Sequence, residues 1–181
     1  VYIKSKYNGF VYDVNVNGTK NIVDKVLESK AKLIYVSSVH AIPEKPNKGL
    51  IKEITDFDPN NVKGLYAKTK SEAAKYVMKL VKNKNLNACI IHPSGIIGPN
   101  DYGNSHLTWL VKEVLNDKLL VSVSGGYDFV DVRDVADGII SACERGIKGE
   151  CYILSNKYIT IKQLTDLICD VQERKRIKLV L

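Results

Sequence analysis

Short, continuously apolar runs alternate with longer amphipathic segments along this chain. The apolar runs are rich in β-branched and aromatic residues, and they cover 32–38, 88–92, 129–132, 151–155 and 177–181. Runs of this length and composition predict strands that are buried inside a sheet. The amphipathic segments repeat apolar residues at helical spacing, and they predict helices over 12–29, 61–82, 105–115 and 134–144, with a further helix opening at 160.

Local signals add detail to these elements. The first predicted helix carries apolar side chains at helical spacing, and we expect them on its buried side: Val14, Ile22, Val23, Val26 and Leu27. Asp134 is predicted to cap the helix that it begins. Pro43, Pro46, Gly49 and Pro59 predict a loop over 40–60.

Strands that alternate with helices predict an α/β fold built around a parallel sheet, and we expect a single domain over 1–181. In such sheets the ligand binds beyond the carboxyl ends of the strands. Two predicted strands end there in small polar residues, Ser37-Ser38 and Pro93-Ser94-Gly95. These two strand ends therefore mark a candidate binding site.

Charge and apolar content exclude several classes of partner. The net charge is +7, but the lysines are scattered and lack the interleaved aromatic side chains of single-strand binders. We therefore expect a solvated basic surface and no nucleic-acid partner. There is no run of about 18 apolar residues, so no membrane span is predicted. The first residues also lack the apolar region of a signal peptide.

The cysteines predict neither a metal site nor a disulfide framework. Cys89, Cys143, Cys151 and Cys169 are far apart, and no Cys-x-x-Cys pair occurs. All four lie in apolar stretches, which predicts buried, reduced thiols. Such thiols are typical of a cytoplasmic protein.

The sharpest chemical signal is Tyr66 followed four residues later by Lys70, inside a predicted helix. Residues four apart share a helix face, so both side chains can reach one small volume. A phenol is a poor acid or base at neutral pH, and a nearby ammonium favours the phenolate and lowers the phenol pKa. A tyrosine tuned in this way can exchange a proton with a carbonyl or alcohol oxygen. Ser38, at the end of the preceding strand, can hydrogen-bond the same oxygen.

In this context the chain resembles the extended short-chain dehydrogenases/reductases, which include the NAD-dependent epimerase/dehydratases and the dihydroflavonol-reductase-like enzymes. Five motifs match in order over roughly 12–165: an N-x-x-G-T helix at 15–19, a catalytic-Ser strand at 33–38, Y-x-x-x-K at 66–70, a strand and loop at 91–99, and D-F-V-D-V-R-D-V-A at 128–136. The resemblance implies a Rossmann-like, doubly wound parallel sheet and the cofactor NAD or NADP. It leaves the choice between the two cofactors open.

The resemblance also implies a role for each matching residue. Ser38, Tyr66 and Lys70 would be catalytic, with Tyr66 as the acid/base and Lys70 also bonding the nicotinamide ribose. The cofactor would contact Tyr66 and Lys70 and four further residues: Asn15, Ser37, Pro93 and Ile96. The substrate would contact Val39, His40 and Ser94. His92 is expected to be a packed strand-end residue, and family members often pair through their two long helices, which implies a possible homodimer.

The largest departure from the family is an absent motif. The family opens with a strand and G-x-x-G-x-x-G, whose backbone N–H groups hold the pyrophosphate, and no such motif occurs in this chain. We therefore expect a partial Rossmann-like domain from an N-terminally truncated enzyme. The strand that ends at Ser38 would then be an open, apolar edge.

A second departure concerns the substrate. Sugar-nucleotide members tend to show R-x-x-N-x-Y-G-P, but here His92, Gly95 and Ile97 replace the Arg, Asn and Tyr. This more apolar pattern is similar to the dihydroflavonol-reductase and hydroxysteroid-dehydrogenase side of the family. The resemblance therefore implies an enzyme that reduces a ketone or aldehyde on a small, fairly apolar molecule. The alternatives are a sugar-nucleotide epimerase or dehydratase and, in another class, a non-catalytic nucleotide-sensing or scaffold protein.

Overall fold

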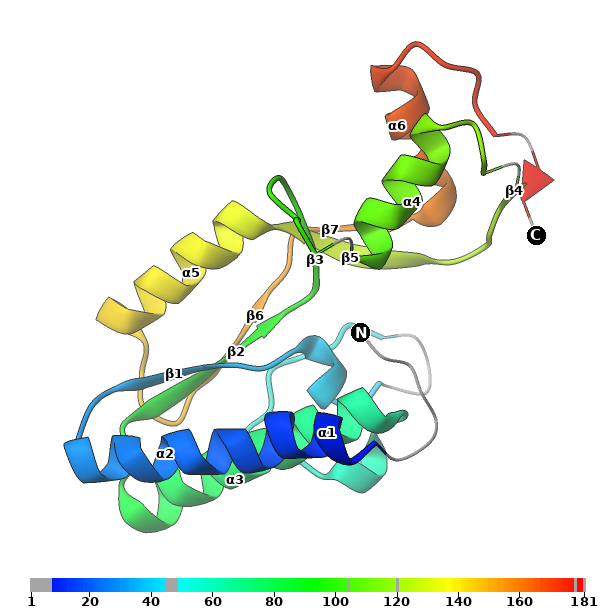
Figure 1. The fold of residues 1–181 in the computed structure, drawn as a ribbon. Coiled ribbons are helices and arrows are strands. Elements are labelled where there is room, and N and C mark those ends of the chain that lie inside the picture. Colours follow the sequence, from blue (N-terminus) through cyan, green and yellow to red (C-terminus); the bar gives the residue numbers. More distant parts are fainter. Residues whose placement is uncertain (1–7, 45–48, 104, 120, 178, 181) are drawn as a thin grey trace. The chain divides into compact units, whose positions relative to one another are not determined.

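The computed structural model describes residues 8–44, 49–103, 105–119, 121–177 and 179–180 (Figure 1). The chain divides into two compact units. The first unit comprises Val1–Ser94 and Ala136–Leu154, and the second comprises Gly95–Val135 and Ser155–Leu181. The expected single domain stays a prediction, and each unit is described by itself.

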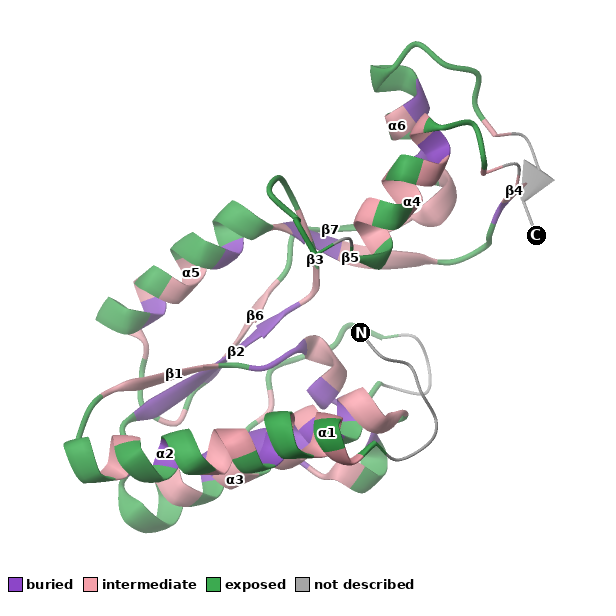
Figure 2. Ribbon diagram, viewed as in Figure 1, coloured by how far each residue is buried: buried purple, intermediate pink, exposed green. Residues whose placement is uncertain are grey.

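A parallel sheet forms the centre of the first unit. Its strands are β1 (Leu33–Val36), β2 (Ala88–Pro93) and β6 (Cys151–Leu154), in the order β1-β2-β6. Both strand pairs are parallel. All six residues of β2 are buried, whereas β1 is only half-buried (Figure 2). β1 is an edge strand in the described part of the chain, as the sequence predicts.

Helices cover both faces of this sheet. Ile90 of β2 packs in one core cluster with Val23 and Val77, from the helices α2 (Gly18–Ser29) and α3 (Leu65–Lys84). Ile91, the next residue of β2, points the other way and packs with Ala142 of α5 (Val132–Arg145). Successive strand residues face opposite sides, so the predicted α/β architecture with a parallel sheet is confirmed.

The first helix differs from the prediction in its start and in its apolar side. It begins as α1 (Gly9–Tyr12), passes through a π-helical turn, η1 (Asp13–Asn17), and continues as α2. Val14 and Ile22 were expected on the buried side but are 56% and 61% exposed, while Val16 and Val23 are buried. A π turn contains extra residues, so it rotates the side chains before it relative to those after it.

Several other boundaries shift for local reasons. The helix predicted from 61 begins at Leu65, because Pro59–Asn61 form a 3-10 turn, η3, and Gly64 precedes the helix with a φ of 89°. Lys30 and Asn85 end α2 and α3 in the left-handed conformation. A further 3-10 turn, η2 (Val39–Ala41), follows β1. α5 begins at Val132, so Asp134 lies in its first turn and is not its cap.

The second unit holds a small mixed sheet and two helices. β3 (Gly95–Ile97) pairs in parallel with β5 (Gly126–Asp131), which pairs antiparallel with β7 (Lys157–Thr160). α4 (His106–Leu115) packs against α6 (Ile161–Val171). A short strand β4 (Val121–Ser122) pairs with β8 (Leu179–Val180). The predicted final strand is confirmed only for 179–180, since 178 and 181 lie outside the described residues, as does Pro46 of the predicted loop.

One of the cysteine predictions is wrong. Cys89, Cys151 and Cys169 are buried free thiols, but Cys143 on α5 is an exposed free thiol. Burial raises the pKa of the Cys151 thiol to about 12. Within the described ranges, no helix is both long and apolar enough to cross a membrane.

Candidate active site

The three predicted catalytic residues come together in the first unit. Ser38 follows β1 and caps η2, where its hydroxyl accepts a hydrogen bond from the His40 amide at 3.3 Å. Tyr66 and Lys70 lie on successive turns at the start of α3. The Lys70 Nζ atom is 5.9 Å from the centroid of the Tyr66 ring, and the Ser38 side chain is near enough to the Tyr66 phenol to lower its pKa.

The ionisation of Tyr66 differs from the prediction. Burial raises the pKa of the Tyr66 phenol above its ordinary value of 10.0, and the hydrogen bond with Ser38 offsets only part of this rise. Burial also lowers the pKa of the Lys70 ammonium. The net shift of the Tyr66 pKa is therefore upward, opposite to the expected lowering, because loss of water outweighs the stabilisation of the phenolate.

A second tyrosine, which the sequence analysis missed, lies beside Lys70. The Lys70 Nζ atom is 5.9 Å from the centroid of the Tyr35 ring, the same distance as from Tyr66. Burial raises the pKa of the Tyr35 phenol above its ordinary value, and its buried hydroxyl has no hydrogen-bond partner among the described residues. Ser37, a predicted cofactor contact, is buried and directly precedes Ser38 in sequence. The alternation of side chains along β1 could have indicated Tyr35, which faces the same helices as Leu33.

Asn15 joins the site through Thr69. The Asn15 side-chain amide donates to the Thr69 hydroxyl at 3.0 Å, and that hydroxyl donates to the Tyr66 carbonyl at 2.9 Å. The Asn15 carbonyl accepts from the Thr19 hydroxyl at 2.7 Å. Asn15 lies in the π turn, a feature that often occurs at functional sites. This network connects the first helix to the backbone of Tyr66, and the sequence analysis did not identify Thr69 as part of it.

Two predicted substrate contacts border the catalytic group. The His40 imidazole meets the Tyr66 ring edge-on, with centroids 6.0 Å apart and an interplanar angle of 79°. Burial lowers the pKa of His40, and Glu44 offsets part of this effect. Val39 is half-buried beside His40 in η2. Both residues are therefore near Tyr66 in the folded chain, as the resemblance implies.

The remaining predicted contacts follow the end of β2. Pro93 is buried in the strand itself. The Ser94 amide donates to the Leu154 carbonyl at 2.9 Å, and its buried hydroxyl has no hydrogen-bond partner among the described residues. Ile96 lies on β3 in the second unit and is 43% exposed.

The polar groups of the first unit fit the ribose end of a nicotinamide cofactor. In the part of the chain that the structure describes, no acidic side chain lies within ion-pair distance of the Lys70 ammonium, which is therefore available to a ribose hydroxyl. The sequence holds no Gly-rich phosphate-binding motif. Among the described residues, no group of three or more His, Cys, Asp or Glu side chains could hold a metal ion.

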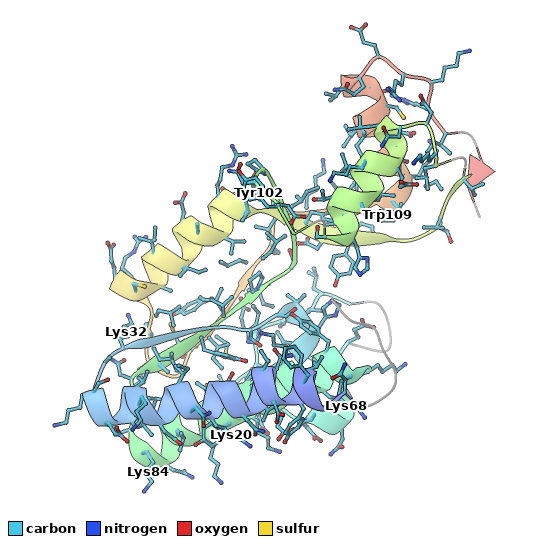
Figure 3. The ribbon with its side chains drawn as sticks, in the orientation of Figure 1. Lys20, Lys32, Lys68, Lys84, Tyr102 and Trp109 are labelled. Carbon is cyan, nitrogen blue, oxygen red and sulfur yellow. The ribbon has the colours of Figure 1, made fainter. Side chains whose placement is uncertain are left out.

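The described lysines elsewhere on this unit are dispersed over its surface. Lys20, Lys68 and Lys84 are spread along the α2–α3 layer (Figure 3). Lys20 lies near Glu72, at 4.0 Å, and over the Tyr76 ring, at 5.7 Å. Dispersed and partly paired lysines fit the interpretation of a solvated basic surface.

The sequence of this chain is similar to a family model and to several known proteins. A sequence model of the NAD dependent epimerase/dehydratase family matches residues 4–155. Sterol demethylase protein B from Methylococcus capsulatus is 26% identical over 175 residues, 94% of this chain and 52% of that protein. A putative dihydroflavonol 4-reductase from Synechocystis is 28% identical over 157 residues, 84% of this chain and 46% of that protein. UDP-glucose 4-epimerases are similar to the chain as well.

The fold is also that of a solved protein. The crystal structure of gox2253 superposes on the whole chain with a TM-score of 0.90 and 30% identity, and the match covers 55% of that structure. The predicted Rossmann-like fold class and the family resemblance are confirmed. This chain spans about half the length of the curated relatives it matches.

Proposed function

Because this chain belongs to the NAD dependent epimerase/dehydratase family, we propose that the protein is an NAD(P)-dependent oxidoreductase that reduces a ketone or aldehyde. The observation that carries this proposal is the half-buried Tyr66 phenol, which has Ser38 and the Lys70 ammonium as neighbours. A phenol, a hydroxyl and an ammonium at one strand end can hold a carbonyl oxygen and protonate it.

Each residue of the group has one task in this reaction. The Ser38 hydroxyl donates a hydrogen bond to the substrate oxygen and keeps it within reach of Tyr66. The Tyr66 O–H then passes its proton to that oxygen as negative charge develops there. The Lys70 ammonium, 5.9 Å from the centroid of the Tyr66 ring, stabilises the resulting phenolate. NAD(P)H, when bound, supplies the hydride that reaches the carbonyl carbon.

The Tyr66 phenol is in the protonated form from which a reduction starts. Burial holds the Tyr66 pKa above 10.0, so the phenol carries its proton at neutral pH. A protonated phenol is ready to act as the acid that reduction needs. Oxidation of an alcohol needs the phenolate, which is scarce under the same conditions.

The cofactor would bind beside Lys70, with Asn15 holding the helix below it and Ser37 next to it. Pro93 and Ile96 would meet the nicotinamide side of the cofactor, as the resemblance implies. The resemblance leaves the choice between NAD and NADP open, so both cofactors enter the test.

The substrate is proposed to be small and fairly apolar. Val39, His40 and Ser94 border the site, and Gly95 and Ile97 stand where sugar-nucleotide enzymes of the family tend to have polar or aromatic residues. Relatives with the names dihydroflavonol 4-reductase and sterol demethylase protein B support this substrate class. We further propose that the protein is cytoplasmic and that it forms a homodimer.

A sugar-nucleotide epimerase is the second candidate, and the similarity to UDP-glucose 4-epimerases favours it. The two reactions differ in their hydride balance. A reductase consumes one reduced nicotinamide for each product molecule, whereas an epimerase returns the hydride to its substrate and consumes none.

The deciding experiment follows a deuterium label. The protein is mixed with NADH or NADPH that carries deuterium at the transferable position, together with a panel of aromatic and alicyclic ketones and aldehydes or with UDP-glucose. The proposal expects deuterium at the carbinol carbon of an apolar product, with stoichiometric oxidation of the cofactor. Conversion of UDP-glucose without net oxidation would establish the epimerase instead, and no conversion of either substrate class would contradict both.

A further inference from the structure

The imidazole of His92 is a fully enclosed polar side chain near the site. It lies at the carboxyl end of β2 and is 0% exposed. Its ring stacks on Phe57, with centroids 5.5 Å apart and an interplanar angle of 30°. Its Nδ1 atom is 2.9 Å from the carbonyl oxygen of Ser38, the residue expected to orient the substrate oxygen.

This contact fixes the form of the ring. A carbonyl oxygen can only accept, so Nδ1 must carry the proton and donate it. The Nε2 atom has no hydrogen-bond partner among the described residues, so a second proton there would be a buried donor without an acceptor. His92 is therefore the neutral Nδ1–H tautomer.

The backbone of Ser38 is held at several points around this bond. Its carbonyl also accepts from the Ala41 amide at 3.0 Å, and the preceding Ser37 amide donates to the Ile91 carbonyl at 2.7 Å. The His92 bond is the one that joins Ser38 to a side chain of the neighbouring strand. With the carbonyl held in this way, the Ser38 hydroxyl lies on the side of Tyr66.

We propose that His92 is a positioning residue for Ser38: its Nδ1–H holds the Ser38 carbonyl at the strand end, and this places the Ser38 hydroxyl against Tyr66. The inference rests on the proposed function only for the task of Ser38 in the reaction. It distinguishes His92 from a merely packed aromatic ring, because packing on Phe57 needs the ring alone, whereas positioning needs the N–H donor.

Two variants distinguish packing from positioning, because one keeps only the aromatic ring and the other keeps only the N–H donor. His92→Phe keeps an aromatic ring of similar size against Phe57 but has no donor. His92→Asn loses the ring but places an N–H donor at the same branch position as Nδ1. A packing role predicts that the Phe variant is closer to the native protein, and a positioning role predicts that the Asn variant is closer.

The Ser38 carbonyl can be observed directly by NMR. Labelling serine with ¹³C at the carbonyl and valine with ¹⁵N selects Ser-Val pairs, and the chain has two, Ser38-Val39 and Ser122-Val123. The second pair lies in the other unit and serves as an internal control. We expect His92→Phe to shift the Ser38 carbonyl signal, His92→Asn to restore most of its position, and the Ser122 signal to stay unchanged.

The second measurement is the pKa of Tyr66, read from ¹³C-labelled tyrosine in the same variants and assigned with Tyr66→Phe. Loss of the Ser38 bond should raise this pKa further in His92→Phe and much less in His92→Asn. In a Ser38→Ala background, the two substitutions should no longer change it, because the hydroxyl through which His92 acts is gone.

Each outcome decides for or against the inference. The inference is supported if His92→Asn keeps the Ser38 carbonyl shift and the Tyr66 pKa near their native values and His92→Phe does not. It is overturned if His92→Phe keeps them as well as His92→Asn does, or better. If neither variant folds, the unsubstituted chain decides. Its three histidines are resolved by ¹⁵N NMR, and an Nε2–H tautomer at His92 would overturn the inference. No cofactor or substrate enters these measurements, so a failure of the proposed reductase activity would be seen separately.

Discussion

At the scale of single residues, burial acts on the tyrosine and the lysine of the site in opposite directions. It raises the pKa of Tyr66 and lowers the pKa of Lys70, because each loses water around its charged form. The Ser38 hydroxyl is the neighbour that lowers the Tyr66 pKa. In the chain without cofactor, the site therefore holds a neutral phenol that is ready to donate a proton.

The first prediction concerns Ser38. In the chain without cofactor, we expect Tyr66 to titrate above 10.0 and Ser38→Ala to raise its pKa further, because the substitution removes the hydrogen bond to the phenolate. Ser37→Ala is the matched control, since Ser37 precedes Ser38 in sequence but is not a group that shifts the Tyr66 pKa. The pKa values are read by NMR of ¹³C-labelled tyrosine. A Tyr66 pKa below 10.0, or equal effects of the two substitutions, would be inconsistent with this electrostatic account.

At the scale of elements, the π turn and the helix caps determine where polar side chains lie. Asn15 lies within η1, and from there its amide reaches Thr69 on α3. Thr160 caps α6 in a reciprocal arrangement with Gln163, in which each side chain bonds the other residue's backbone amide. Both arrangements are local enough to be tested by single substitutions.

The second prediction is that Asn15→Ala lowers the free energy of unfolding by about 1 kcal/mol, because it leaves the bond between two helices unmade. Asn17→Ala is the control. Asn17 lies in the same π turn, but its side chain bonds the exposed Asp13, so its loss should cost at most a few tenths of a kcal/mol. Urea unfolding measures both values, and equal losses would show that the Asn15 contact contributes little.

The third prediction concerns the cap of α6. Thr160→Ala should lower the free energy of unfolding by about 1 kcal/mol, whereas Thr160→Ser keeps the cap and should lower it much less. Thermal unfolding monitored by circular dichroism compares the two variants. If alanine and serine behave alike, the threonine hydroxyl is not the stabilising group.

The elements that the sequence predicts well are those with a long or continuous pattern. The buried strand β2 and the helices α3 and α4 are of this kind, and so is the Tyr66–Lys70 pair, because the spacing of four residues places both on one face. The strands β3, β4 and β7 have two to four residues, too few for a period to show.

Other features depend on contacts that no local pattern contains. The exposure of Val14 follows from a π turn, which the regular helical period does not include. The direction of the Tyr66 pKa shift depends on what covers α3, and the role of His92 depends on a residue 54 positions away in sequence.

At the scale of the whole molecule, buried histidines couple stability to pH. Burial lowers the pKa of His40 and of His92 below 6.5 in the folded chain, so the unfolded chain binds more protons at mildly acidic pH. Stability then decreases as the pH falls below 6.5. Asp101 and Asp131, whose pKa values are held at about 2 instead of 3.8, add to this decrease only at more acidic pH.

The fourth prediction follows from this coupling. The free energy of unfolding should fall between pH 6.5 and pH 5, and His92→Phe should flatten this fall, because the residue that must stay neutral is removed. His40→Asn should flatten the remainder. Urea titrations at a series of pH values measure these slopes. An unchanged slope in His92→Phe would mean that His92 is not neutral in the fold.

The central claim is that Tyr66 protonates a carbonyl oxygen in a nicotinamide-dependent reduction, and the most direct test is the carbonyl-dependent oxidation of NADH or NADPH. The unsubstituted protein, Tyr66→Phe and Tyr76→Phe are compared with the same ketone and aldehyde panel. Tyr76 is the control, because it lies on the same helix and its hydroxyl donates to Asp24 at 2.9 Å, away from the site. We predict turnover in the unsubstituted protein and in Tyr76→Phe, and a loss of roughly 100-fold or more in Tyr66→Phe. Equal turnover in Tyr66→Phe, or no carbonyl-dependent oxidation in any of the three proteins, would contradict the claim.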